Sequence, residues 1–376
     1  MKQKAYIISC MFLSLSCLSQ NEFDFKGQFS ALTSFSPEND LDWFIGGRYI
    51  PEASYNIQFD SLHNLDFNVV LNLDASMLFH PFNTSETDAN IDPYRVWARY
   101  SGENYEIRLG LQKIDFGSAT LLRPLQWFNQ IDPRDPLQLT NGVYGALGRY
   151  YFPNNANIWV WSLLRNEKTR GFEVIQTDKN IPEFGTRVQL SVPNGEIAFS
   201  YHHRTANSDN LLALPQYAKI QENRFGLDGK WDVEVGLWFE ATHTIKDKDV
   251  GVFTNQSLLN VGTDYTFGLG NGLNVVTEHL ISAFDENAFD FKNTENTTAL
   301  SVNYPLGFFD TISAMYYYNW DFQGNTVFLN FEHQFNKLSG YVMAYYNPEA
   351  QQSIQTNELT NSFSGPGIRL MLVYNH

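Results

Sequence analysis

Charged side chains that can hold a small anion gather between residues 95 and 149 of this sequence. An arginine guanidinium binds a carboxylate or phosphate through two parallel hydrogen bonds. Aspartates in the same region can pair with these arginines instead and fix the local structure. The sequence predicts a solute path or an ion-pair network made of Arg95, Trp97, Arg99, Arg108, Asp115, Arg123, Trp127, Asp132, Arg134, Asp135 and Arg149, with Arg369 near the C-terminus.

The spacing of the arginines predicts that they line one face of a β-structure. Arg95, Trp97 and Arg99 occupy alternate positions, and alternate side chains of a strand point to the same face. Three further arginines fall on the polar faces of other segments: Arg108, Arg149 and Arg369. Such a row favours anionic solutes through its local field, although the formal net charge of the chain is −16. The alternative is that the arginines pair with neighbouring carboxylates and have a structural role.

Residues 114–141 form the longest connection between the strands that the sequence predicts. The segment carries three prolines and paired opposite charges, which indicate an ordered structure. Its Trp127 and Phe128 are poorly suited to open water. We expect this segment to fold inward and narrow a pore, and the alternative is a cap that packs on the rim of a barrel.

The strands that would position these residues are visible as alternating sequence. Every second residue from Leu65 to Phe79 is apolar, and most of the residues between them are Asp, Asn or Ser. The same period recurs in residues 105–112, 231–240, 327–335 and 368–374. One apolar and one polar face over such lengths indicate tilted strands that cross a membrane in a closed barrel.

Short turns rich in Gly, Asn and Pro alternate along the chain with longer polar segments. The longer segments are near residues 80–92, 114–141, 165–182, 205–219, 244–256, 284–296 and 348–362. Bacterial barrels have short periplasmic turns and long external loops, so the alternation gives the orientation. The sequence therefore predicts an all-β, antiparallel up-and-down transmembrane barrel of about eighteen strands. Sixteen strands is the alternative count, since Gly46, Gly47 and Pro51 interrupt the second strand.

The N-terminus has the order of a secretory signal peptide. Lys2 and Lys4 precede an apolar stretch, and small residues follow up to Gln20. We expect residues 1–19 to be removed and residues 20–376 to form the barrel; lipid attachment at Cys17 is the alternative. Both cysteines lie in this segment, so the mature chain would have no disulfide, thiol chemistry or cysteine metal site.

Composition excludes several other classes. The acidic balance argues against nucleic acid binding, which depends on clustered Lys and Arg. No stretch approaches the ~20 apolar residues that a spanning helix needs. The sequence predicts no cofactor and no metal.

One segment resembles a known family. Residues 108–117, Arg-Leu-Gly-Leu-Gln-Lys-Ile-Asp-Phe-Gly, are followed by a loop containing Asp132-Pro133. This pattern resembles the strand and loop of alginate-export-like outer-membrane porins, over residues 105–136. Phe116 stands where that family has Trp. The resemblance implies a monomeric barrel of about eighteen strands in the outer membrane, through which small or anionic solutes diffuse.

The predicted function is therefore passive passage of small solutes, with anions favoured, through an outer-membrane barrel in contact with lipid. A non-conducting structural or assembly-associated barrel is the first alternative. An outer-membrane hydrolase is the second, and the scattered histidines argue against it, because catalysis needs a nucleophile and base within hydrogen-bond reach. The sequence predicts that His202 and His203 point to opposite faces of a strand. The tyrosines near residues 316–318 and 345–346 predict aromatic belts at the membrane interface.

Overall fold

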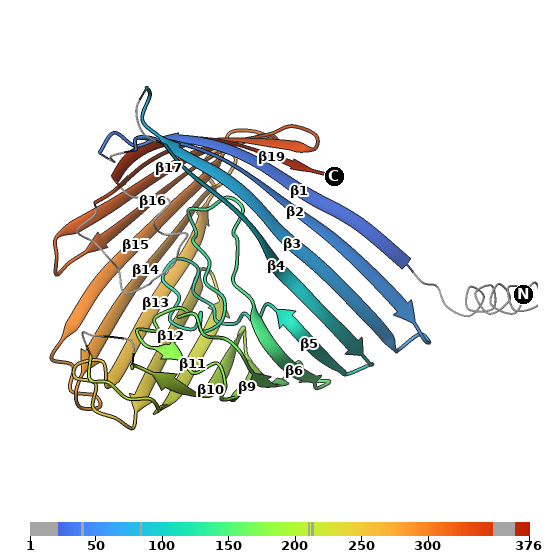
Figure 1. Cartoon of the computed structure of the whole chain (residues 1–376), viewed down its shortest axis with the longest axis vertical. Helices are drawn as coiled ribbons and strands as arrows, with labels where there is room; N and C mark the ends of the chain where they lie inside the picture. The colour runs from blue at the N-terminus through green and yellow to red at the C-terminus, as the bar shows by residue number, and fades with distance from the viewer. Residues whose placement is uncertain (1–21, 39–40, 83–84, 210, 212–213, 349–364) are drawn as a thin grey trace, which may run out of the picture.

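The computed structural model describes residues 22–38, 41–82, 85–209, 211, 214–348 and 365–376. Within these residues the chain is built from antiparallel strands (Figure 1). The strands are β1 (Glu22–Phe35), β2 (Trp43–Gln58), β3 (Asn64–Phe79), β4 (Ser85–Ser101), β5 (Tyr105–Gln112), β6 (Val143–Tyr151), β7 (Asn157–Leu163), β8 (Gln176–Thr177), β9 (Glu183–Val192), β10 (Gly195–Asn207), β11 (Ile220–Asp232), β12 (Gly236–Lys246), β13 (Asn255–Phe267), β14 (Leu273–Asp285), β15 (Thr294–Pro305), β16 (Asp310–Asn319), β17 (Gly324–Gln334), β18 (Leu338–Asn347) and β19 (Gly365–Asn375).

The sheet closes on itself. Each long strand pairs with its neighbours in the sequence, and β1 pairs both with β2 and with β19. The two-residue strand β8 adds to the end of β10 and lies outside the ring. The described residues therefore form a closed barrel of eighteen strands, which confirms the predicted fold class and excludes the count of sixteen. Despite its glycines and proline, β2 runs unbroken, and it pairs with β1 along its length.

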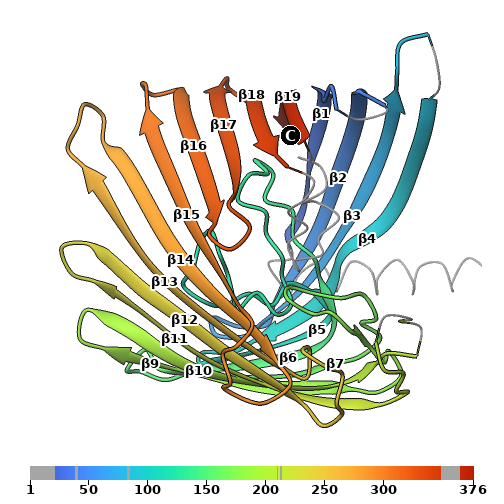
Figure 2. The same cartoon turned by 90° about the vertical axis from the view of Figure 1, so that its left-hand side faces the viewer.

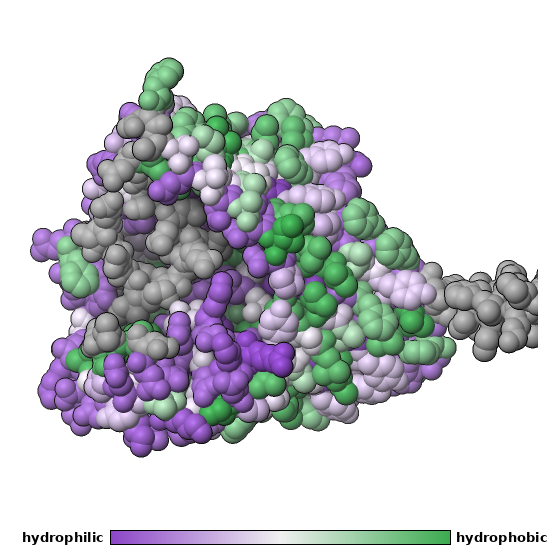
Figure 3. All heavy atoms as spheres, in the orientation of Figure 1, coloured by the Kyte–Doolittle hydropathy of each residue, from purple (hydrophilic) through white to green (hydrophobic). Residues whose placement is uncertain are grey.

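Apolar side chains cover the outside of the barrel. Leu109, Leu329 and Leu370 are about half exposed, although they lie in the interior of barrel strands. Figure 3 shows apolar side chains spread over β1–β4 and hydrophilic ones gathered at the opposite, loop-bearing end. An exposed apolar wall on a closed barrel is stable only against lipid, so the chain is an outer-membrane β-barrel.

The connections fix the orientation of the barrel. Those at one end, such as residues 102–104 and 193–194, are two to five residues long. The longest connections, residues 113–142 and 164–182, lie at the other end. The first end is therefore periplasmic and the second external. No helix in the described part of the chain is long and apolar enough to cross a membrane.

One predicted loop is wrong in its extent. Residues 85–92 belong to β4, where Asn90 pairs with Asp74 of β3. Their side chains are exposed, so their polar composition reflects contact with water and not the absence of a strand. Two predictions lie largely or wholly outside the described residues, namely the signal peptide and the loop at 348–362.

The aromatic runs divide between the two faces of the barrel. Tyr316 and Tyr346 point outward, as expected for an interface belt. Tyr317 and Tyr345 instead pack among inward-facing residues, so the belt prediction is wrong for these two. Alternation along a strand requires this division, since adjacent residues face opposite sides.

Candidate pore constriction

Residues 113–142, which we call the inner loop, lie inside the barrel. Figures 1 and 2 show this segment between β5 and β6 passing through the space that the strands enclose. Its apolar residues pack on the inward face of the wall. Phe116, Trp127 and Phe128 form one buried cluster with Leu147 and Trp161. Removal of these rings from water supplies the main driving force for the inward fold.

Two carboxylates of the barrel wall bind the backbone of the inner loop. On β12, Glu240 accepts hydrogen bonds from the backbone N–H groups of Ala119 at 2.8 Å and Leu125 at 3.0 Å. On β14, Glu278 accepts bonds from the backbone N–H of Thr120 and of Leu122, both at 2.6 Å. Together the two side chains satisfy four backbone N–H groups of the loop, so they fix the loop across the lumen.

The glycine at position 117 is required by this anchoring. Its φ of +102° lies in the region that side chains rarely adopt. A Cβ atom on Gly117 would also lie 2.3 Å from the Oε1 atom of Glu240. The loop therefore reaches Glu240 because residue 117 has no side chain.

Predicted charges of the inner loop form pairs. Arg123 Nη2 lies 2.7 Å from Asp115 Oδ1, and Arg134 binds Asp132 through two hydrogen bonds of 2.9 and 2.8 Å. Burial opposes ionisation of Asp115, but the charge of Arg123 holds the pKa of Asp115 below its ordinary value. These arginines are therefore neutralised within the loop itself.

The Asp135 carboxylate accepts hydrogen bonds from the backbone N–H groups of Leu137 at 3.0 Å and Leu139 at 3.4 Å. Burial raises the pKa of Asp135 above its ordinary value, and these two bonds only partly oppose the shift. The carboxylate therefore shapes a turn of the loop. On the facing wall, the guanidinium of Arg369 lies 5.9 Å from the ring of Tyr345.

Arg95 and Tyr94 hold the end of the inner loop. Arg95 donates to the backbone oxygens of Thr140 at 3.0 Å and Asn141 at 3.2 Å, while the Tyr94 hydroxyl accepts the N–H of Thr140 at 3.0 Å. Adjacent strand residues normally face opposite sides, but the register between β3 and β4 shifts next to Pro93. This irregularity lets both Tyr94 and Arg95 contact Thr140. Arg95 therefore acts as a loop anchor.

Three other predicted arginines surround one glutamate near the periplasmic end. Arg149 lies 3.0 Å from Glu106, and Arg99 and Arg108 each lie 3.7 Å from it. Arg99 also binds Asp66 at 2.9 Å. We call these five residues the arginine cluster. Three guanidiniums face two carboxylates, so its formal charge is +1.

Tryptophans support this cluster. The guanidinium of Arg108 lies 4.8 Å from the ring of Trp97, and that of Arg149 lies 3.7 Å from the ring of Trp159. Such stacking holds a guanidinium flat against a ring while its edge remains able to bind. The Arg99 side chain keeps 32% of its surface exposed. Arg99 is therefore the most accessible of the three arginines.

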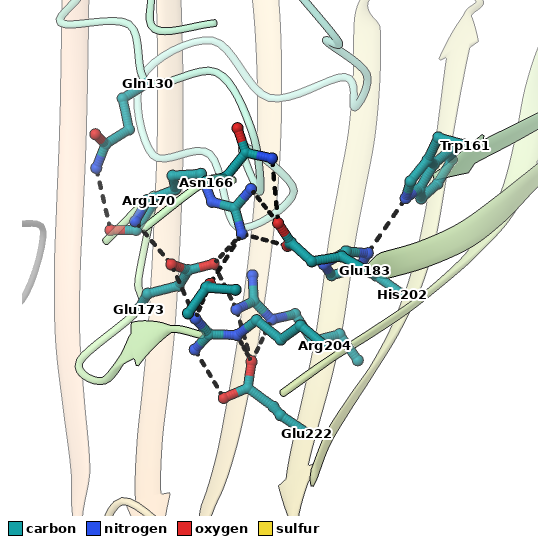
Figure 4. Close-up of polar contacts among 12 residues, drawn as sticks. Gln130, Trp161, Asn166, Arg170, Glu173, Glu183, His202, Arg204 and Glu222 are labelled. Carbon is teal, nitrogen blue, oxygen red and sulfur yellow. Dashed lines mark hydrogen bonds and ion pairs between the residues drawn. The ribbon is translucent and has the colours of Figure 1, made fainter. Parts of the chain in front are cut away.

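A second segment, residues 164–182, also folds inward, and we call it the second loop. It meets the inner loop where Gln130 Nε2 donates to the backbone oxygen of Gly171 at 3.3 Å. Figure 4 shows its Arg170 and Glu173 among charged side chains of the barrel wall. Glu173 lies 3.2 Å from Arg204 of β10. The two loops therefore pack on each other inside the barrel.

The charged residues around the second loop form a buried network. Arg170 binds Glu183 at 2.5 Å, and Arg204 binds Glu222 at 2.6 Å (Figure 4). Arg224 lies 2.6 Å from both Glu173 and Glu222. Each of these charges has an opposite partner, which burial of an ion requires.

His202 joins this network as a neutral ring. Its Nδ1 atom accepts the indole N–H of Trp161 at 3.2 Å, so the proton of the ring lies on Nε2. That Nε2 atom lies 3.2 Å from Glu183 and donates to it. His203 points outward, where its ring contacts Phe184, so the two histidines lie on opposite faces of β10.

The sequence did not single out the residues that hold the two loops in place, of which Arg170 and Glu173 belong to the second loop and the others to the barrel wall. The missed group is Glu173, Glu183, Glu222, Glu240, Asn260, Glu278, Arg170, Arg204 and Arg224. A usable signal was present, since Glu222 and Arg224 occupy alternate positions on the polar face of one strand. The sequence could not show which distant strands each loop contacts, such as β12 and β14 for the inner loop.

Comparisons with solved structures place this geometry among known folds. The chain resembles OccD3 (OpdP) of Pseudomonas aeruginosa, with a TM-score of 0.60 and 9% identity over 94% of this chain and 91% of that one. OccAB1 of Acinetobacter baumannii gives a TM-score of 0.58 and 10% identity over 95% and 96%. These neighbours are Gram-negative outer-membrane porins. The chain has the porin fold.

OccAB4 of Acinetobacter baumannii shares the same porin fold, with a TM-score of 0.55 and 11% identity over 96% of this chain and 99% of that one. No protein-family model and no curated protein sequence matches the chain. The narrower resemblance to alginate-export-like porins stays a prediction.

Proposed function

We propose that this barrel is a channel for passive diffusion of small hydrophilic solutes across the outer membrane. One observation carries the proposal: an ordered loop is fixed across the lumen by Glu240 and Glu278 of the wall. The loop packs on the wall beside its own strands and is also bound by the wall opposite. A barrel that served only as a membrane anchor would not need such a loop. The inner loop sets the size limit of the channel.

We further propose that the channel prefers anions. The arginine cluster carries a net positive charge at the periplasmic end, and its guanidiniums are partly accessible. A fixed charge in a narrow lumen attracts the opposite ion through its local field, whatever the charge of the whole chain. Arg95, Arg123 and Arg134 are paired or bonded to the loop and take no part in this selection.

Swelling of proteoliposomes tests the channel. Vesicles that contain the protein should swell in isotonic arabinose faster than vesicles without it, because the sugar and water enter together. A larger solute such as raffinose should enter more slowly. A swelling rate equal to that of empty vesicles for every solute would remove the proposed function.

Reversal potentials in a salt gradient test the anion preference. The double variant Arg99→Gln with Arg149→Gln should shift the reversal potential toward cation selectivity, since the cluster loses two positive charges. Arg165→Gln, at an exposed position of the second loop, is the matched control and should leave it unchanged. An unchanged potential in the double variant would assign the cluster a structural role.

A non-conducting barrel is the second candidate, favoured by the packing of the two loops on each other. Gly171 lies so close to the inner loop that a Cβ atom there would be 2.6 Å from the backbone oxygen of Gln126. Such close packing can seal a lumen. The swelling assay separates the two candidates, because a sealed barrel passes neither sugar.

A further inference from the structure

An apolar groove lies on the outside of the barrel, away from the lumen. It encloses about 440 Å³ over the outward faces of β10 to β14. Phe199, Phe225, Leu259 and Ile281 form its sides. At its floor is Ala241, a small residue between larger outward-facing neighbours, which leaves the hollow.

An external loop gives the groove a roof. Phe289 and Phe291 belong to the connection between β14 and β15 and line the groove from above. The ring of Phe289 stacks on His243 at 4.1 Å with an angle of 15° between the planes. His243 in turn bonds through Nδ1 to Ser257 Oγ at 2.8 Å. These contacts hold the roof against the wall, so the groove is formed without a ligand.

The position of the groove along the barrel shows which leaflet of the membrane it faces. His243 lies close to the external end of β12, and the roof comes from an external loop. The groove therefore opens toward the outer leaflet of the membrane. Its size lies within the range of sites that bind small ligands, and such sites bind by apolar contact. In that leaflet of a Gram-negative outer membrane the apolar molecules are the acyl chains of lipopolysaccharide.

We propose that this groove binds one acyl chain of a lipopolysaccharide molecule under Phe289 and Phe291. Roughly cylindrical outer walls offer lipids only transient contact, whereas a roofed hollow surrounds a chain on several sides. Taking an acyl chain out of disordered lipid costs free energy. Close contact of the chain with these aromatic rings offsets that cost. This site is separate from the lumen, so the proposal does not depend on the proposed channel function.

Native mass spectrometry of the full-length barrel in detergent, with rough lipopolysaccharide added, tests the proposal. Wild-type protein should retain one lipopolysaccharide molecule after mild activation. Ala241→Phe fills the floor and should lower the bound fraction on the order of tenfold. Phe289→Ser with Phe291→Ser removes the roof and should have the same effect. Ala344→Phe adds the same ring to the outward face of β18 and should bind as wild type does.

Several results would overturn the proposal. Equal retention by wild type and Ala241→Phe would show that the groove is not the site. Equal retention of phosphatidylethanolamine and lipopolysaccharide would show ordinary annular lipid. A mass shift of the wild type to an oligomer that Ala241→Phe disrupts would mean that a second copy of the chain covers the groove. A difference in mobility between unheated and heated protein on a denaturing gel would verify that each variant is folded.

Discussion

At the scale of single residues, the lumen depends on acidic side chains that the sequence analysis did not single out. Glu278 contacts the backbone of Thr120 and Leu122 and also accepts the side-chain amide of Asn260 at 3.1 Å. The predicted arginines divide by role: Arg95 anchors the loop and Arg149 belongs to the arginine cluster. Alternation identified the face on which each residue lies, but it carried no information about which partner each would meet.

Glu278→Gln should loosen the inner loop while the barrel remains closed. The amide keeps the shape of the carboxylate but loses its charge and presents a donor to backbone donors, so we expect a cost of about 1.5–3 kcal/mol in loop anchoring. Limited proteolysis should cleave the variant within residues 113–142 faster than wild type. Glu332→Gln, on the inward face of β17, is the control, since its carboxylate bonds to Tyr341 on the neighbouring strand. Equal cleavage of all three proteins would contradict the anchoring role.

At the scale of elements, the strands were predictable and the loops only in part. A strand with one apolar face has an apolar residue at every second position. This pattern predicted the bounds of β3 and β5 to within a residue or two. Polar segments carry no such period. The polar residues 85–92 were therefore predicted as loop, and the predicted start of β4 is too late. The inward path of the second loop depends on Arg204 of β10 and Arg224 of β11, which bind its Glu173. Contacts between elements distant in sequence could not be inferred from one chain alone.

Arg204→Met should destabilise the packing of the second loop. Removal of one cation leaves Glu173 and Glu222 buried without a full set of partners, at a cost of about 3–5 kcal/mol. Unfolding in urea should occur at a lower concentration than for wild type. Lys179→Met removes an exposed ion pair with Glu167 and should have little effect. Equal losses in both variants would mean that the network is not a source of stability.

The second loop should also release at low pH. Burial opposes ionisation of Glu173, but Arg170, Arg204 and Arg224 hold the pKa of Glu173 below its ordinary value of 4.5. A carboxylate with a lowered pKa gives its full stabilisation above the ordinary value and loses it as the pH falls through the lower one. Protease protection of residues 164–182 should therefore be constant from pH 8 to about pH 5 and fall below about pH 4.5. Loss of protection near pH 6 would contradict this assignment.

At the scale of the whole molecule, the barrel is stable because its two faces meet different solvents. Leu329 faces lipid with 48% of its surface exposed, whereas Asn330 faces the lumen. Leu329→Arg should cost about 2–4 kcal/mol if the residue lies near the bilayer midplane, because the charge enters hydrocarbon. Asn330→Arg should cost less, and urea unfolding in vesicles compares the two. A larger cost for Asn330→Arg would reverse the assignment of faces.

Single-channel recording in planar bilayers tests the central claim, that the inner loop constricts an open pore, most directly. Wild-type protein should give discrete current steps, and the double variant Glu240→Gln with Glu278→Gln should give larger ones, because the loop that narrows the lumen is released. Absence of steps from both proteins, each verified as folded, would contradict the account and favour a sealed barrel.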